Sequence, residues 1–192
     1  MHASASIAFA LAALATSAAA APVAYKIDPG HTYPSFEADH MGGVSTWRGK
    51  FNNTSGTIVL DREEQTGSID VTVAIDSIDF GNEKLNGHAK TPDMFDAAKY
   101  PTATYTGKFV DFKNGAPTAI DGALTLHGVT KPLKLTIDTF LCKPHPVNKK
   151  ELCGANASGT LNREEFGIAF GKNLGFDMKT VLRIQVEASR AE

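Results

Sequence analysis

Histidine and arginine side chains are the first candidates for polar chemistry in this sequence. His31 and His40 are candidates to lie near each other at one end of a binding site, where an imidazole can donate a hydrogen bond to a phosphate or quinone oxygen or act as a general base. A buried histidine that bonds a backbone carbonyl would give the same pattern. Arg163 offers a contact for the polar group of a ligand, although hydrogen bonds from its guanidinium to backbone carbonyls, which would fix the preceding strand to the turn, are the favoured interpretation.

Motifs that carry catalysis are missing from the chain. The sequence contains no G-x-S-x-G, H-E-x-x-H, P-loop or Rossmann phrase. One catalytic hypothesis remains, in which His31 or His40 acts as the base on a bound ligand. Binding without catalysis is the favoured interpretation.

The two cysteines flank a short polar segment, residues 143–152. In an exported protein, an even and closely spaced pair is most simply a disulfide, so we expect Cys142 and Cys153 to be joined across the end of a hairpin. The alternative is a metal site that includes His145. It lacks another Cys or His at ligand spacing, so we expect no metal.

Composition and charge suit one globular domain with a substantial core. The chain has 192 residues, of which 42% are hydrophobic, and a formal net charge of −2. Nucleic acids and anionic membrane surfaces are recognised by clustered Lys and Arg, and no such cluster is present. The charge pattern therefore gives no support for a nucleic-acid partner.

The N-terminal residues have the form of a secretory signal peptide. Residues 3–21 are small and apolar and lead into an Ala-x-Ala run, so we expect cleavage after Ala20. A retained membrane anchor is the alternative, but Ala and Ser make a poor membrane span. The expected organisation is a signal peptide at 1–20 and one domain at 21–192.

Most of the remaining chain alternates apolar and polar residues, as strands do. The clearest runs are 68–78, 120–126, 133–137 and 176–188, and residues 127–132 form the turn of a hairpin. In 102–112 the apolar face switches after Phe109, which suggests a β-bulge.

A single short helix is expected at residues 91–99. Thr91 can cap it, Pro92 suits its first position, and Asp93 complements the helix dipole. The segment 82–90 is left without an assignment.

These elements predict an all-β fold of about eight antiparallel strands. A sheet with one apolar face must pack on a second sheet or close into a barrel, and an eight-stranded barrel holds its own side chains or one small ligand. Small residues recur on the inward faces, where they either leave room for a guest or relieve crowding. The periodicity does not choose between these two roles. The small inward residues are Ala103, Gly107, Gly122, Ala155, Ala157 and Gly159.

Four phrases, in order along the chain, resemble those of the YceI-like family of exported lipid-binding proteins. They are residues 25–32 (YKIDPGHT) followed by Phe36 and His40, residues 93–101 (DMFDAAKYP), residues 122–132 (GALTLHGVTKP) and residues 163–167 (REEFG). The resemblance spans residues 25–188 and implies an extended, lipocalin-like, eight-stranded antiparallel barrel. It also implies a periplasmic setting and an enclosed long isoprenoid or similar acyl chain. Ala38, Met94 and residues 85–89 depart from the family pattern.

We therefore expect a periplasmic carrier that encloses a polyprenyl, quinone-type or similar acyl lipid. The partner would be a long apolar small molecule, with no cofactor other than such a lipid. Transient contact with the membrane or a membrane redox protein, and a homodimer, are compatible with this role. One alternative is a hydrolase or isomerase that acts on the bound lipid with His31 or His40 as the base. The other is a β-sandwich with a filled core that acts as an interaction domain. His31 and Arg163 are the head-group candidates, and the candidate lining residues are Phe36, His40, Ile69, Val71, Val73, Tyr105, Leu124, Leu126, Leu135, Met178, Leu182 and Ile184.

Overall fold

The alternating segments of the sequence form one continuous antiparallel sheet in the computed structural model, which describes residues 21–192. Residues 1–20, the predicted signal peptide, lie outside the described residues. The helical elements are α1 (Glu83–Ala89) and three short 3-10 turns, η1 (Ile75–Ser77), η2 (Arg163–Phe166) and η3 (Lys172–Leu174). The strands are β1 (Val23–Ile27), β2 (Tyr33–His40), β3 (Ser45–Phe51), β4 (Thr54–Asp61), β5 (Thr66–Ala74), β6 (Ile78–Asp79), β7 (Thr102–Val110), β8 (Ala119–Leu126), β9 (Val129–Pro144), β10 (Glu151–Asn162) and β11 (Lys179–Arg190).

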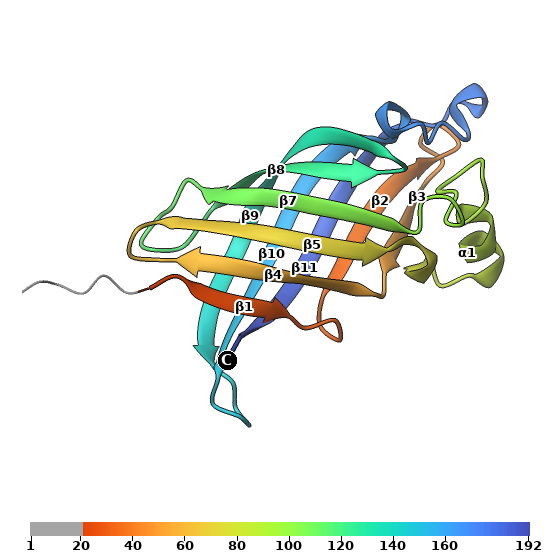
Figure 1. Cartoon of the computed structure of the whole chain (residues 1–192). Helices are drawn as coiled ribbons and strands as arrows, with labels where there is room; N and C mark the ends of the chain where they lie inside the picture. The colour runs from red at the N-terminus through yellow and green to blue at the C-terminus, as the bar shows by residue number, and fades with distance from the viewer. Residues whose placement is uncertain (1–20) are drawn as a thin grey trace, which may run out of the picture.

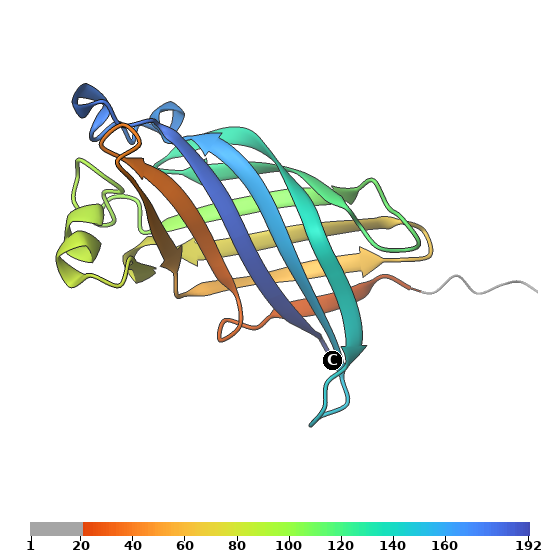
Figure 2. The same ribbon diagram turned by 180° about the vertical axis from the view of Figure 1, so that it is seen from behind.

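The sheet closes on itself as an eight-stranded barrel in the order β1-β4-β5-β7-β8-β9-β10-β11. Closure occurs where β1 pairs with the end of β11, with Ile27 opposite Ala188. The first half of β11 pairs instead with β2, which continues through β3 to β6. Figure 1 and Figure 2 show this second arm rising along one side of the barrel toward α1. The predicted all-β barrel is confirmed, and the β-sandwich alternative is wrong.

The hairpin between β8 and β9 has a tighter turn than predicted. Only His127 and Gly128 connect the strands, and both have positive φ, 52° and 76°. Two consecutive positive φ angles are typical of the type I′ turn that matches the twist of a hairpin. Pro132 therefore lies within β9, opposite Ala123, and not in the turn.

The predicted helix at 91–99 is wrong, because the helix lies immediately before it. Asn82 caps α1 by accepting a hydrogen bond from the backbone N–H of Leu85 at 3.2 Å. The Thr91 hydroxyl donates to the carbonyl of His88 at 2.6 Å, so it caps the end of α1 instead of starting a new helix. Residues 91–100 form turns, and the positive φ of Asp96 (46°) interrupts any helical continuation.

The β-bulge predicted near Phe109 is also absent from its expected place. β7 pairs with β8 in unbroken register as far as Val110. The switch of the apolar face marks the end of the strand, where Asp111 takes a positive φ of 57°. The register shift lies instead between β9 and β10, at Asn156 and Ala157.

The predicted disulfide is confirmed. Cys142 and Cys153 are directly opposite each other on β9 and β10 and are bonded. Both sulfur atoms are therefore unavailable to a metal. The ring nitrogen Nδ1 of His145 accepts hydrogen bonds from the backbone N–H groups of Val147 and Asn148, so this histidine orders the turn of the hairpin. Within residues 21–192, no helix has the length and apolar character to cross a bilayer.

Candidate ligand-binding cavity

The barrel encloses an apolar cavity of about 410 Å³, and its wall is built from the inward rows of the strands. Its size lies within the range of pockets that bury small molecules. On β11 the wall runs from Thr180 to Val186, which corresponds to about 20 Å along the strand. The inward side chains therefore do not fill the barrel as a solid core throughout.

The alternation of apolar and polar residues predicted lining residues that do lie on the cavity wall, with one exception. Met178 is buried but does not line the cavity, because it precedes the start of β11. The other predicted residues lie on the wall, although their contact with a ligand stays a prediction. They are Phe36, His40, Ile69, Val71, Val73, Tyr105, Leu124, Leu126, Leu135, Leu182 and Ile184.

Two of the small inward residues accommodate large neighbours and do not leave empty space. A Cβ atom on Gly122 would lie 2.5 Å from the ring of Tyr105, so the ring packs directly against the backbone of β8. A Cβ atom on Gly159 would lie 2.7 Å from the side chain of Leu135. The Tyr105 hydroxyl donates to the carbonyl of Leu133 at 2.9 Å, and burial raises the pKa of this phenol above its ordinary value. At these positions glycine serves packing, as the crowding interpretation proposed.

The end of the barrel beyond Ile27, which we call the closed end, is filled by the protein's own side chains. Tyr25, which is 2% exposed, packs there with Ile27 and Leu60. The Tyr25 hydroxyl donates to the carboxylate of Glu151 at 2.8 Å. Burial, reinforced by this carboxylate, raises the pKa of Tyr25 to about 12. The cavity therefore has no exit between these residues.

The opposite end, which we call the mouth, is surrounded by aromatic rings. The ring of His40 contacts Trp47 in a tilted arrangement (centroids 4.9 Å apart) and Phe176 edge to face (5.2 Å). His88 lies on α1 and lines the cavity, with its ring centroid 4.7 Å from that of Phe170. Its Nε2 atom is buried and has no hydrogen-bond partner within residues 21–192.

The sequence suggested that His31 and His40 lie near each other, and the structure shows that they do not. His31 is on the exposed turn between β1 and β2, where its Nδ1 is 2.8 Å from the carboxylate of Asp28. This pairing raises the pKa of His31 and lowers that of Asp28. Since β2 separates the two histidines and a strand extends about 3.3 Å per residue, they are at opposite ends of the barrel wall. His31 is absent from the cavity.

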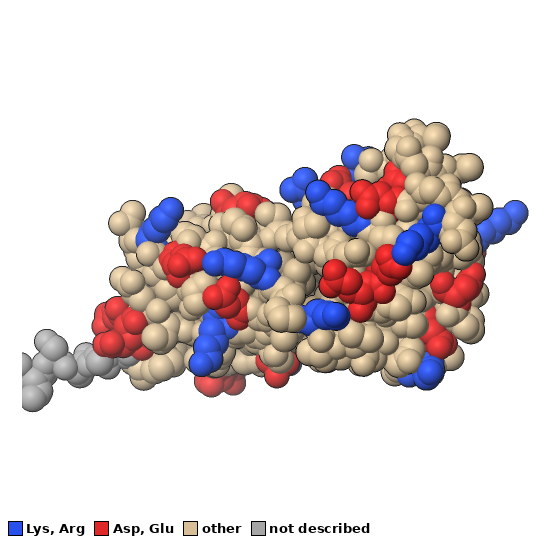
Figure 3. Space-filling model, turned by 90° about the horizontal axis from the view of Figure 1, so that it is seen from above, with Lys and Arg blue, Asp and Glu red and all other residues tan. Residues whose placement is uncertain are grey.

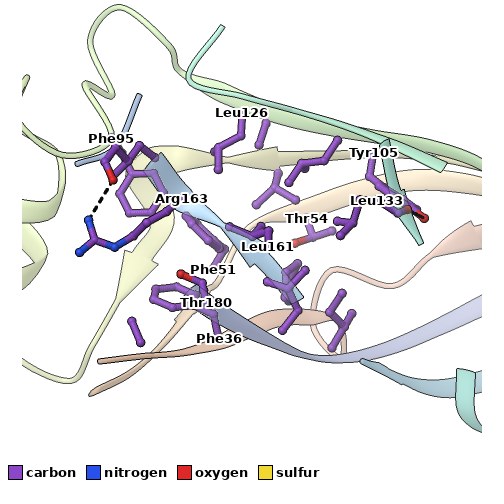
Figure 4. Close-up of a pocket in the computed structure, with 18 of the residues that line it drawn as sticks. Phe36, Phe51, Thr54, Phe95, Tyr105, Leu126, Leu133, Leu161, Arg163 and Thr180 are labelled. Atoms are coloured by element: carbon purple, nitrogen blue, oxygen red, sulfur yellow. Dashed lines mark hydrogen bonds between the residues drawn. The ribbon is translucent and has the colours of Figure 1, made fainter. Parts of the chain in front are cut away.

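Arg163 bonds backbone carbonyls, as predicted, but these belong to the chain that follows it and not to the preceding strand. The residue also lies on the cavity wall (Figure 4). Its guanidinium donates to the carbonyl oxygens of Ile168 at 2.9 Å and Phe170 at 2.8 Å. Burial lowers its pKa, opposed by the charges of Asp177 and Asp39. The arginine therefore fixes the chain that follows η2 at the edge of the mouth.

The predicted lining residues omit those that come from irregular segments, although the departures from the family pattern at Met94 and residues 85–89 fall there. Leu85 on α1, together with Met94 and Phe95 in the turns after it, covers the mouth side of the cavity. No periodicity marks them, and the helix was expected elsewhere. Alternation also did not identify Thr54, which is 1% exposed and whose Oγ1 has no partner in the described part of the chain.

Charge on the outside of the barrel is mixed. The face in Figure 3 shows Lys and Arg interspersed with Asp and Glu, without a large patch of one sign. Several of these residues form exposed pairs, including Lys134 with Asp111 and Arg48 with Glu37. The cavity wall, in contrast, is almost entirely apolar, so the site suits an apolar ligand.

Comparison with known proteins agrees with this geometry. The model of the YceI-like domain matches residues 25–189. A UPF0312 protein of Pectobacterium atrosepticum is 31% identical over 162 residues, covering 83% of each chain, and protein YceI of Escherichia coli O157:H7 is 33% identical over 147 residues, covering 75% of each.

Solved structures share the fold. A YceI protein of Campylobacter jejuni has a TM-score of 0.65 at 28% identity and covers 78% of this chain and 88% of its own. A polyisoprenoid binding domain from Saccharophagus degradans has a TM-score of 0.61 at 16% identity, covering 88% and 99%. The chain therefore belongs to the YceI-like family.

Proposed function

We propose that this protein binds one long apolar lipid, a polyprenyl or quinone-type isoprenoid or a similar acyl chain, inside the barrel and carries or stores it in the periplasm. The observation that carries the proposal is the apolar cavity of about 410 Å³, filled at one end and bordered by partly exposed aromatic residues at the other. A small polar metabolite would leave this wall without complementary groups.

Burial of hydrocarbon is sufficient to retain such a ligand. Each methylene removed from water contributes about 0.8 kcal/mol, so ten enclosed groups would contribute roughly 8 kcal/mol before the costs of ordering. The Saccharophagus degradans domain, which shares the fold, is described as a polyisoprenoid binding domain, and this supports the ligand class.

Export is supported by two features. Residues 1–20 have the form of a signal peptide, and the Cys142–Cys153 disulfide suits an oxidising compartment. Binding without catalysis is supported by the position of His31 outside the cavity, which removes one of the two candidate bases.

Organic extraction of protein purified natively from the periplasm, followed by mass spectrometry, tests the proposal. We expect a long-chain isoprenoid or acyl lipid in near-stoichiometric amount. A bare extract from protein that was never exposed to detergent would contradict it.

A variant that fills the cavity supplies the specific control. Leu182 faces the cavity, whereas Gln185 on the same strand is exposed, so Leu182→Trp should abolish the extracted lipid and Gln185→Trp should retain it. Thermal unfolding checks that both variants are folded. Equal lipid content in the two variants would place the lipid elsewhere.

A further inference from the structure

Two loops lie side by side at the mouth, and we call them the rim loops: residues 41–44 between β2 and β3, and residues 167–178 between η2 and β11. A Cβ atom on Gly42 would lie 3.1 Å from the carbonyl oxygen of Gly175. Figure 1 and Figure 2 both show the two loops together, projecting beyond the barrel.

One carboxylate fixes the rim loops to each other. Asp39 accepts hydrogen bonds from the backbone N–H groups of Gly42 at 3.0 Å, Gly43 at 2.6 Å and Asp177 at 2.9 Å. These bonds, that from Asp177 foremost, lower the pKa of Asp39, so it is ionised at neutral pH. The loops are therefore presented as one surface.

The rim loops carry most of the exposed large apolar side chains of the described residues. Met41 is 54% exposed, Val44 76%, Phe170 38% and Leu174 65%. The other two such residues, Leu141 and Val147, lie on the β9–β10 hairpin at the opposite end. A group of exposed apolar residues of this kind marks an interaction surface.

The rim loops are poor in charge. Residues 41–44 contain no Asp, Glu, Lys or Arg, and residues 167–178 contain only Lys172, which pairs with Glu164, and Asp177. A protein partner is normally selected by a pattern of charges and hydrogen bonds around an apolar centre. A lipid bilayer needs no such pattern and accepts protruding apolar side chains at its interface.

The surface is continuous with the cavity. Phe170 is exposed on a rim loop and also lines the cavity. Phe176, near the end of the same loop, lines the cavity too. Trp47, which follows the other loop, lines the cavity as well. A chain that leaves the cavity through the mouth therefore emerges beside the exposed apolar residues.

We propose that the rim loops dock on a phospholipid bilayer by inserting Met41, Val44, Phe170 and Leu174, so that the mouth of the cavity faces the membrane. This inference rests on the proposed lipid-binding function. Because the surface lacks basic residues beyond the paired Lys172, apolar insertion drives docking and electrostatic attraction to anionic lipids does not.

Flotation of the mature chain with vesicles tests the inference. We expect equal binding to vesicles of phosphatidylcholine alone and to vesicles that also contain phosphatidylglycerol, with no loss at high salt. Binding that requires phosphatidylglycerol and disappears in salt would overturn the inference in favour of charge-driven adsorption. The absence of binding to either vesicle would overturn it in favour of a protein partner.

The chain offers a matched set of variants. The pair Val44→Asp and Leu174→Asp should lower vesicle binding by about tenfold or more, since it removes two apolar contacts and adds two charges that resist insertion. Val147→Asp, at an 83% exposed valine on the opposite end, should leave binding unchanged. Equal loss in both proteins would overturn the docking surface. If the double variant unfolds early, Val44→Asp alone should still bind several-fold more weakly than Val147→Asp.

The lipid extracted from the same preparations separates this inference from the proposed function. A chain that carries lipid but binds no vesicle overturns docking and leaves the cavity proposal intact. A chain that shows the expected variant pattern on vesicles but yields a bare extract supports docking and counts against the carrier role.

Discussion

The two ends of the barrel are built by different means. At the closed end, regular strands bring Tyr25, Ile27 and Leu60 into a close-packed cluster, and the Tyr25 hydroxyl bonds Glu151. At the mouth, the wall comes from α1, from turns and from the rim loops, and apolar side chains remain exposed. Strand pairing thus provides stability at one end, and irregular segments provide access at the other.

The largest difference between the ends should appear in stability. Leu60→Ala truncates a buried side chain at the closed end and should lower the free energy of unfolding by about 2 to 5 kcal/mol. Val44→Ala at the mouth should change it by less than about 0.5 kcal/mol. Urea unfolding followed by circular dichroism measures both, and similar losses would remove the distinction.

A smaller loss of stability is expected from removing the Arg163 guanidinium, which holds a loop of the mouth by hydrogen bonds. Arg163→Met keeps the packing of the side chain but leaves the carbonyls of Ile168 and Phe170 without their donor, which should cost about 1 to 3 kcal/mol. Hydrogen exchange should accelerate in residues 168–175 and not in β1. Lys172→Met, which removes an exposed ion pair from the same loop, is the control and should have little effect.

The smallest effect on stability is expected from the exposed ion pair between His31 and Asp28, which lies outside the cavity. The pKa of His31 is raised above its ordinary 6.5 by Asp28, so the pair stabilises the folded chain fully below that pH and loses its effect as pH rises through the folded pKa. The pKa of Asp28 is lowered, so protonation of this carboxylate removes the contribution again at acid pH, below 3.8.

Replacing His31 should therefore flatten this weak pH dependence without changing the extracted lipid. Thermal unfolding as a function of pH, compared between wild type and His31→Ala, provides the measurement. Lipid loss in His31→Ala would show that the turn between β1 and β2 contributes to binding.

Sequence alone identified the strand-built part of the molecule because side chains on a strand alternate strictly. The rows on β5, β8 and β11 were assigned to the correct face, and the disulfide followed from spacing and compartment. The error at Met178 arose from extending alternation past the end of a strand.

The mouth could not be predicted in the same way, since turns and short helices have no fixed period. Asn82 and Thr91 are both good capping residues, so local propensity could not decide which of them begins a helix. In the structure Asn82 caps the start of α1, and Thr91 bonds the end of the same helix. The separation of His31 from His40 was within reach of the sequence, because an extended segment of that length spans about 30 Å.

The filled closed end has a consequence for how a guest would travel. A tube with one opening admits a chain by its tail or by its head, and whichever tip goes in first must come out last. A lipid drawn in tail first would keep its polar group among the aromatic residues that surround the mouth. Delivery would then begin with the polar group, and the hydrocarbon would follow.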